Sequence, residues 1–362
     1  MKVIHIGFLG GLGGLQNSIY SLAEVQARRG LEVQLMRPPW EDPALEIHTR
    51  LPVIPWDLER VRGFDLVHTH GGAGFQNRWI RRETKKPIVH SYYGTAMGCQ
   101  IALRWFQNLV GWDGFGTLHD ILREALGGRH AQAVIAVSPM IRSEVKKFYG
   151  VQGKKTTVIP CGYTRERSGC SRKPPRREFG LPEEAFLFLF VGRRADPMKN
   201  LPAAVEAFRR VRLRFPHAHL VVAPKQDLSL EGGITGVELP PQKMNLLYRC
   251  ADVLVHPALY EPNSLAVHEA LVNGLPVIVG RNTGNADYCT HLVDALILPR
   301  KRGAALVDSL VEMMCLLIES KELRTKLGQE AAQKFGPRDW DWVEAETAKV
   351  YSRLMEAPKP RP

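Results

Sequence analysis

Short apolar runs alternate with helix-forming segments along the chain, and the alternation occurs twice. The apolar runs are residues 3–8, 31–36, 66–68, 88–90, 134–137 and 158–159, and then 186–191, 220–223, 253–256 and 277–279. Strands that alternate with helices favour a parallel sheet covered by helices on both faces. The pattern therefore predicts an α/β protein with two tandem doubly wound, Rossmann-like domains.

A basic, proline-containing stretch separates the two series. Residues 165–182 contain six Lys or Arg and interrupt the alternation, which is typical of a linker. The predicted domains are therefore residues 1–164 and 183–338, followed by a helix at 339–357. Ligands of doubly wound sheets bind beyond the carboxyl ends of the strands, so two such sheets facing a cleft would bring two substrates together.

Composition limits the class of protein further. The chain has 362 residues, enough for about two domains, and its hydrophobic content of 44% excludes a disordered chain. No apolar run approaches the roughly 18 residues that span a bilayer. Residues 1–6 enter a strand pattern directly, so we expect no secretory signal. Six cysteines without Cys-x-x-Cys spacing indicate reduced thiols, and hence a cytoplasmic protein.

The positive charge is concentrated in the first half. Residues 1–164 hold 20 Lys and Arg against 13 Asp and Glu, whereas residues 179–362 hold 23 against 22. We expect an anionic partner or an anionic membrane surface to face the first domain, with plain solubility as the alternative. The aromatic and basic stretch 104–112 fits either interfacial membrane contact or core packing. No nucleic-acid partner is expected, because no recognition module is present in the sequence.

A glycine-rich loop follows the first predicted strand and opens a helix. Its Gly13 and Gly14 would let a phosphate approach the backbone at a helix N-terminus, although a tight strand-to-helix turn explains the glycines as well. An NADP-binding interpretation is weaker. Gln16 replaces the third glycine of the dinucleotide fingerprint, and Arg37, which would face a 2′-phosphate, stands where NAD proteins carry an acid.

Two carboxylates flank a helix start in the second half. Glu261 lies on a loop just after a predicted strand, Asn263 or Ser264 caps the next helix, and Glu269 lies about one and a half turns inside it. A nucleotide-sugar would contact all three parts. Glu269 would accept hydrogen bonds from ribose hydroxyls, the amides near Ser264 and Leu265 would hold a phosphate, and Glu261 would accept from sugar hydroxyls.

Two cationic residues precede this segment. Arg193 lies two residues after the end of a predicted strand and Lys199 lies six residues on, with Arg194 as a substitute for Arg193. A strand-end arginine and a nearby lysine form a clamp for a diphosphate and stabilise charge that builds on a leaving group. Either cluster alone is explained by surface ion pairs. Together, on successive loops of one domain, they favour a donor site.

These motifs resemble those of the retaining nucleotide-sugar glycosyltransferases of the GT-B fold, glycosyltransferase family four. The signature of two glutamates separated by seven residues matches Glu261 and Glu269, and the family's arginine and lysine resemble Arg193 and Lys199. The resemblance covers nearly the whole chain. It implies that the first domain binds the acceptor, that the second binds the donor, and that the last helix crosses back to the first domain. It also implies neither cofactor nor metal.

The chain departs from the family pattern in the first domain. Tyr93 stands where the family usually has a histidine that contacts the donor sugar, and His90 lies three positions earlier. Both are candidates for a sugar or acceptor contact, as is His119. Asp339 and Asp341 imitate a metal-binding Asp-x-Asp pair, but their place before the last helix favours a helix N-cap.

The sequence therefore predicts a retaining glycosyltransferase that moves a sugar from a nucleoside-diphosphate sugar to an acceptor hydroxyl. The expected acceptor is lipid-linked or an anionic glycan, as in cell-envelope polysaccharide or glycolipid synthesis. The expected location is the cytoplasm, with the inner face of the membrane as the alternative. Two other functions remain open: a nucleotide-sugar epimerase or hydrolase of the same fold, and a non-catalytic protein that binds sugar nucleotides.

Overall fold

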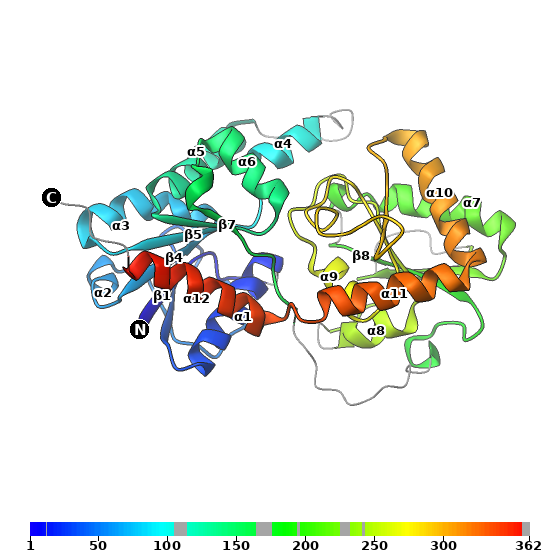
Figure 1. Ribbon diagram of the computed structural model, residues 1–362, viewed down its shortest axis with the longest axis horizontal. Helices are drawn as coiled ribbons and strands as arrows, with labels where there is room; N and C mark the ends of the chain where they lie inside the picture. The colour runs from blue at the N-terminus through cyan, green and yellow to red at the C-terminus, as the bar shows by residue number, and fades with distance from the viewer. Residues whose placement is uncertain are drawn as a thin grey trace. The chain divides into compact units, whose positions relative to one another are not determined.

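The computed structural model divides the chain into two compact units. Unit 1 comprises Met1–Thr164 and Arg338–Pro362, and unit 2 comprises Arg165–Pro337. The structure describes residues 1–11, 13–104, 114–163, 176–193, 196–224, 232–240 and 243–356. Figure 1 shows one sheet in each unit with helices around it. The stretch 104–112, singled out for its aromatic and basic residues, and Arg194 lie outside the described residues, apart from the backbone of Arg104.

Unit 1 contains a seven-stranded parallel sheet in the order β3-β2-β1-β4-β5-β6-β7. Its strands are β1 (Lys2–Ile6), β2 (Glu32–Met36), β3 (Val53–Ile54), β4 (Leu66–His70), β5 (Ile88–Tyr92), β6 (Ala133–Ala136) and β7 (Thr156–Val158). The central strands β4 and β5 are buried along their whole length. Strands buried on both faces need cover from helices. Each of these two strands begins with two apolar residues and then carries buried polar residues, among them His68, His70 and His90.

The helical segments of unit 1 join successive strands. They are α1 (Gly14–Arg28), α2 (Leu58–Val61), η1 (Gly71–Gln76), α3 (Asn77–Thr84), α4 (Ala96–Arg104), α5 (Gly114–His130), α6 (Pro139–Tyr149) and η2 (Gly153–Lys155). Ser138 caps α6 and accepts from the amide of Ile141, followed by a proline in the first turn, which is the expected order of signals at a helix start.

The last helix, α12 (Trp340–Glu356), belongs to unit 1 although it follows unit 2 in the sequence. It packs against α1, as the red and dark blue helices of Figure 1 show. Arg28 and Arg29 at the end of α1 pair with Asp341 and Glu344 of α12. Gly162 allows the close approach of Trp340, because a Cβ at that glycine would lie 2.8 Å from the Trp340 ring.

Unit 2 contains a six-stranded parallel sheet in the order β10-β9-β8-β11-β12-β13. Its strands are β8 (Phe186–Val191), β9 (Ala218–Ala223), β10 (Ile234–Gly236), β11 (Val253–His256), β12 (Val277–Val279) and β13 (Leu296–Ile297). Its helical segments are η3 (Arg176–Phe179), η4 (Pro197–Lys199), α7 (Leu201–Arg214), α8 (Met244–Cys250), α9 (Leu265–Val272), α10 (Gly303–Glu319) and α11 (Lys321–Phe335). Separate apolar clusters cover the two faces of the sheet, one with α7 and α10 and the other with α8 and α9, and α11 contributes residues to both clusters.

The predicted fold class is confirmed: both units are α/β with parallel sheets of the doubly wound type. Three predicted strands coincide residue for residue with β8, β11 and β12. The short strands β3, β10 and β13 were not predicted, because two or three residues carry too little periodicity to separate them from loops. Among the described residues, no helix combines the length and the apolar character needed to cross a membrane.

Candidate active site

Lys199 and Glu261 form an ion pair at the carboxyl edge of the unit 2 sheet. Lys199 ends η4, which follows β8, and Glu261 lies on the loop after β11, the strand next to β8. The Lys199 ammonium donates to a carboxylate oxygen of Glu261, and each side chain is 14% exposed. The two residues expected to contact the donor from different loops are therefore in direct contact.

Hydrogen bonds on both sides of Lys199 fix its position. The carbonyl oxygen of Met198 accepts from the Leu259 amide at 2.8 Å, and the Asn200 side chain donates to the Pro257 carbonyl oxygen at 3.2 Å. Asn200 adopts a left-handed conformation (φ 57°), which asparagine tolerates better than most residues and which ends η4 before α7 begins. The η4 turn is thereby attached to the loop that carries Glu261.

Gly192 provides space for the lysine. A Cβ at this position would lie 3.0 Å from Cγ of Lys199 and 3.0 Å from the ring of Phe190. The lysine stem thus passes closely over the backbone at the end of β8. A side chain at position 192 would press against the lysine stem.

Arg193 does not join this pair. Its guanidinium contacts Asp196 at 3.0 Å, and its side chain is 77% exposed. Asp196 also accepts from the amide of Met198 and so caps η4. The structure therefore brings two of the three predicted catalytic residues together, and it gives the third a role at the start of the turn.

The loop of Glu261 is held by the segment after β12. The Glu261 amide donates to the Asn282 carbonyl oxygen at 3.3 Å, and the Glu261 carbonyl oxygen accepts from the Gly284 amide at 2.8 Å. Gly280 permits this approach, because a Cβ there would lie 2.5 Å from the carbonyl oxygen of Ala258. The backbone of Glu261 is therefore fixed on both sides.

Helix α9 begins at Ser264, one of the two residues predicted as its N-cap. The Ser264 hydroxyl accepts from the Val267 amide, whereas the Ser264 amide donates to the side chain of buried Asn285 at 2.6 Å. Ser264 was expected to offer its amide to a phosphate, and in this structure Asn285 occupies that amide. Within the described residues, the amides of Leu265 and Ala266 make no hydrogen bond to the protein. These two first-turn amides are the phosphate-binding groups that the helix end provides.

Glu269 lies on α9, half-buried, and accepts a hydrogen bond from the hydroxyl of buried Tyr248 on α8. Asn263 directly precedes the cap and is also half-buried. Glu261, Asn263, Leu265 and Glu269 therefore all belong to the loop and helix that follow β11. Sequence reasoning missed Tyr248 and Asn285, because their contacts join segments that are not adjacent in the sequence.

His256, the last residue of β11, is another residue that sequence reasoning missed. It is fully buried, and neither of its ring nitrogens has a hydrogen-bond partner within the described residues. Burial lowers the pKa of His256 well below the usual range, and the charge of Lys199 lowers it further. A histidine at the end of an otherwise apolar strand was the available sequence signal. Its ring is neutral beside the lysine.

The glycine-rich loop of unit 1 uses part of its backbone internally. A Glu41 oxygen accepts from the amides of Leu9 and Gly10, each at 2.6 Å. Gly13 is the N-cap of α1 without a side-chain cap, and Gly14 is its first residue. Arg37 donates to the carbonyl oxygens of Pro43 and Leu45 at 2.7 Å. Its guanidinium therefore holds the loop that contains Pro43 and Leu45, and these contacts occupy the groups that would bind a 2′-phosphate.

Of the two first-domain candidates for a sugar contact, His90 is enclosed and Tyr93 is half-buried. His90 is fully buried against Gly74 and Gly127 and bonds to Thr69 at 2.9 Å, so its ring is used inside unit 1 and a sugar or acceptor contact stays a prediction. The Tyr93 hydroxyl lies 3.1 Å from His70. The cavity that Tyr93 lines has a volume of about 20 Å³, enough for one water. His119 lies on α5, and its side chain is outside the described atoms.

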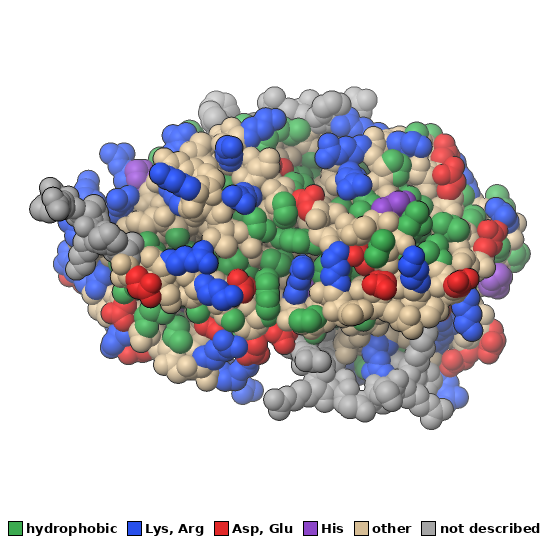
Figure 2. All heavy atoms as spheres, viewed as in Figure 1, with side chains coloured by type: hydrophobic (Ala, Val, Ile, Leu, Met, Phe, Trp, Pro, Cys, Tyr) green, Lys and Arg blue, Asp and Glu red, His purple; other side chains and the backbone are tan. Residues whose placement is uncertain are grey.

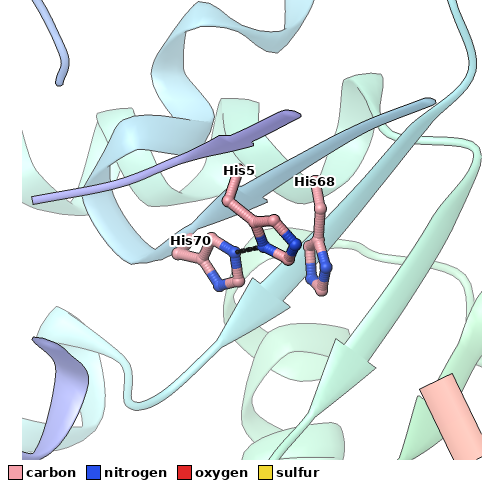
Figure 3. A group of neighbouring side chains, drawn as sticks. All are labelled: His5, His68 and His70. Atoms are coloured by element: carbon pink, nitrogen blue, oxygen red, sulfur yellow. Dashed lines mark hydrogen bonds between the residues drawn. The ribbon is translucent and has the colours of Figure 1, made fainter. Parts of the chain in front are cut away.

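Three buried histidines of unit 1, His5, His68 and His70, form a further cluster (Figure 3). They come from β1 and β4, and one ring nitrogen of each histidine lies within 4.8 Å of one ring nitrogen of the other two. The rings of His68 and His70 are stacked with centroids 4.2 Å apart. Stacked rings point their in-plane lone pairs in parallel, which is a poor arrangement for a shared cation.

Hydrogen bonds explain this cluster more fully. Seven side chains form a closed ring in which each donates to the next: Tyr93 to His70, His70 to His5, His5 to Gln26, Gln26 to Tyr351, Tyr351 to His68, His68 to Ser91, and Ser91 to Tyr93. The Gln26 oxygen can only accept, so the proton of His5 is on Nε2, and this assigns the other histidines in turn. All six ring nitrogens have protein partners, and the ring links α12 to the sheet.

Asp339 caps the last helix. Its side chain accepts from the Trp342 amide at 2.9 Å, as predicted, and Asp341 pairs with Arg28 and Arg29.

The geometry defines a class of protein: two doubly wound units, one of which carries acidic and basic side chains and free helix amides at its carboxyl edge. Two family models match the chain, one described as Glycosyltransferase Family 4 at residues 12–167 and one as Glycosyl transferases group 1 at residues 171–334. The chain belongs to the GT-B glycosyltransferases of family four, as predicted, and it transfers a sugar from a nucleotide sugar.

Known relatives and structures agree with this assignment. An uncharacterized glycosyltransferase of Methanocaldococcus jannaschii is 24% identical over 95% of each chain. The phosphatidyl-myo-inositol mannosyltransferase of Mycobacterium leprae is 25% identical over 94% of this chain and 93% of its own. The fold is similar to that of Anabaena HepE in complex with UDP-glucose, with a TM-score of 0.76, 16% identity and coverage of 98% and 100% of the two chains.

Proposed function

We propose that this chain is a retaining, metal-independent hexosyltransferase that uses a nucleoside-diphosphate sugar and an anionic or lipid-linked acceptor. The observation that carries the proposal is the Lys199–Glu261 contact beside the first turn of α9. A diphosphate brings negative charge to Lys199 and to the amides of Leu265 and Ala266. Once phosphate oxygens accept from Lys199, Glu261 is released to accept hydrogen bonds from sugar hydroxyls.

The proposed reaction needs positioning and charge stabilisation more than a protein nucleophile. The bond between the anomeric carbon and the phosphate oxygen breaks while the acceptor oxygen bonds to the same face of that carbon. The leaving phosphate takes the proton of the acceptor hydroxyl, so atoms and charge balance. Lys199 and the α9 amides stabilise the negative charge that develops on the diphosphate, and thereby supply the positive charge that a metal ion supplies in other transferases.

A lipid-linked acceptor is supported by one exposed surface of unit 1. We call the exposed side chains Phe75, Arg78, Trp79, Arg81 and Arg82 the α3 surface. Trp79 is 50% exposed and Phe75 40%. Aromatic residues with arginines suit the interface of an anionic bilayer. Figure 2 shows further Lys and Arg side chains, in blue, spread over the visible face of unit 1.

Two further observations favour the membrane assignment. The pKa of His130, at the end of α5, is lowered by burial and then by the charges of Arg78 and Arg81, so positive groups gather here. The relative from Mycobacterium leprae is by name a transferase that acts on a phosphatidylinositol. We therefore propose that the protein acts in the cytoplasm at the inner face of the membrane, to which it binds through unit 1.

The test is binding followed by product analysis. A thermal-shift panel of UDP-, GDP- and ADP-sugars should raise the melting temperature for one base, because a ligand of the folded state stabilises it. Incubating the binding sugar nucleotide with and without phosphatidylinositol vesicles then separates the functions. A glycolipid product supports transfer, free sugar or an epimer in the absence of acceptor supports the alternative enzymes, and binding without turnover supports a binding protein.

A further inference from the structure

Tyr248 contacts Glu269, the second of the two signature glutamates of unit 2. It lies on α8, is 1% exposed, and packs in the same apolar cluster as Val267, Ala270 and Leu271 of α9. Its hydroxyl makes a hydrogen bond to the side chain of Glu269. A polar contact of buried Tyr248 therefore reaches Glu269, the residue proposed to bind the ribose.

The protonation of this contact has a single assignment. Burial raises the pKa of Tyr248 well above its usual value, and the charge of Glu269 and the hydrogen bond to it add to the effect. Tyr248 therefore remains a phenol at every working pH, so it donates and Glu269 accepts. A carboxylate has about four acceptor sites, so this bond is compatible with accepting two ribose hydroxyls as well.

We infer that Tyr248 is a positioning residue for the donor, holding the Glu269 carboxylate in the orientation that accepts the ribose hydroxyls. The inference rests on the proposed function, because it assumes that unit 2 binds a nucleoside diphosphate. A half-buried carboxylate on a helix has several rotamers, and a hydrogen bond from a rigid, packed phenol selects one of them. The bond thus orders Glu269 before the ligand arrives.

A ribose-specific binding experiment tests the role. UDP, GDP and ADP, each paired with its 2′,3′-dideoxy analogue, are titrated calorimetrically into the wild type, Tyr248→Phe and Glu269→Gln. We expect one ribonucleotide to bind the wild type more tightly than its dideoxy analogue. Tyr248→Phe should weaken that ribonucleotide about tenfold and leave the dideoxy analogue within twofold. Addition of Tyr248→Phe to Glu269→Gln should change little.

Tyr351→Phe is the matched control, because it removes another buried phenol from the other unit. It should leave the ribose preference intact, and thermal melting reports on folding in all variants. If Tyr248→Phe weakens both analogues equally, or neither, the positioning role is overturned while the donor site stands. If no diphosphate binds the wild type, the proposed donor site is overturned and the inference with it. A donor assay should show the loss mainly in KM, with kcat within a few fold.

Discussion

Lys199 donates a hydrogen bond to Glu261 across 62 residues of sequence, at a sheet edge that both residues reach from adjacent parallel strands. Parallel strands bring their carboxyl ends to one edge, so loops far apart in the sequence meet there. The pair is 14% exposed on each side, where charges interact more strongly than on an open surface. Each residue neutralises the other until a more highly charged phosphate competes for the lysine.

Replacement of Lys199 tests the centre of the proposed site. Lys199→Ala should lower the rate of sugar transfer by about two to three orders of magnitude, because it removes charge stabilisation from the leaving group. The measurement is initial-rate kinetics with the sugar nucleotide found by thermal shift. Lys334→Ala is the matched control, since it breaks an ion pair to buried Asp294 elsewhere in unit 2. Comparable rates for Lys199→Ala and Lys334→Ala would contradict the assignment.

The sequence predicted this edge because its signals are local. Glu261, Ser264 and Glu269 lie within one turn and helix, and Lys199 follows its own strand closely, so motif spacing was enough. Tyr248 and Asn285 were missed because their partners are distant in the sequence and are brought near only by packing. The burial of His90 was missed for a related reason: its spacing to Gly94 did not show that its ring packs against Gly74 and Gly127.

His256 should destabilise the fold as it stands. A buried polar ring without a hydrogen-bond partner loses its hydration without compensation. His256→Leu, which has a similar volume, should therefore raise the free energy of unfolding by about 1 kcal/mol at pH 7.5, measured by urea denaturation. His219→Leu is the control, because that ring bonds to Thr235 at 2.8 Å and its loss should be neutral or destabilising. A loss of stability in His256→Leu would show that the ring has a partner in solution.

Stability should fall between pH 7.5 and pH 5. Burial lowers the pKa of His5 to about 4 and that of His90 to about 3, and it lowers those of His68 and His70 well below the usual value. Below about pH 6.5 these histidines therefore bind protons in the unfolded chain but not in the folded chain. The free energy of unfolding consequently decreases as the pH falls. Each such histidine contributes up to about 1.4 kcal/mol per pH unit.

Glu124 opposes this trend and provides the control. Burial raises the pKa of its carboxyl to about 7, so the folded chain keeps a proton that the unfolded chain loses between about pH 4.5 and 7. Its contribution to stability falls as the pH rises. Glu124→Gln should therefore make the pH dependence steeper, as measured by urea unfolding at several pH values. A flat profile in the wild type would mean that the buried histidines are hydrated.

The closed hydrogen-bond ring predicts a spectroscopic result. If the donors run in one direction, His5, His68 and His70 are all neutral with the proton on Nε2. Nitrogen-15 correlation spectra of the imidazoles should show three such tautomers that do not titrate down to about pH 5. Tyr351→Phe should alter all three, because a hydrogen-bond chain polarises its members together. Three rings that titrate near pH 6.5 would contradict the closed ring.

The α3 surface should bind anionic vesicles and lose binding in two separable ways. Replacement of Arg81 and Arg82 by glutamate should abolish binding to vesicles that contain phosphatidylinositol, and the wild-type affinity should fall with salt, because these charges act through a screened surface potential. Trp79→Ala should weaken binding with little change in salt dependence, since it removes apolar insertion and leaves the charges.

Reversal of Arg209 and Arg210 on α7 of unit 2 is the matched control, with the same change in net charge on the other unit. Equal losses from both charge reversals would indicate that net charge, and not the α3 surface, drives association. A sedimentation assay at several salt concentrations separates these outcomes.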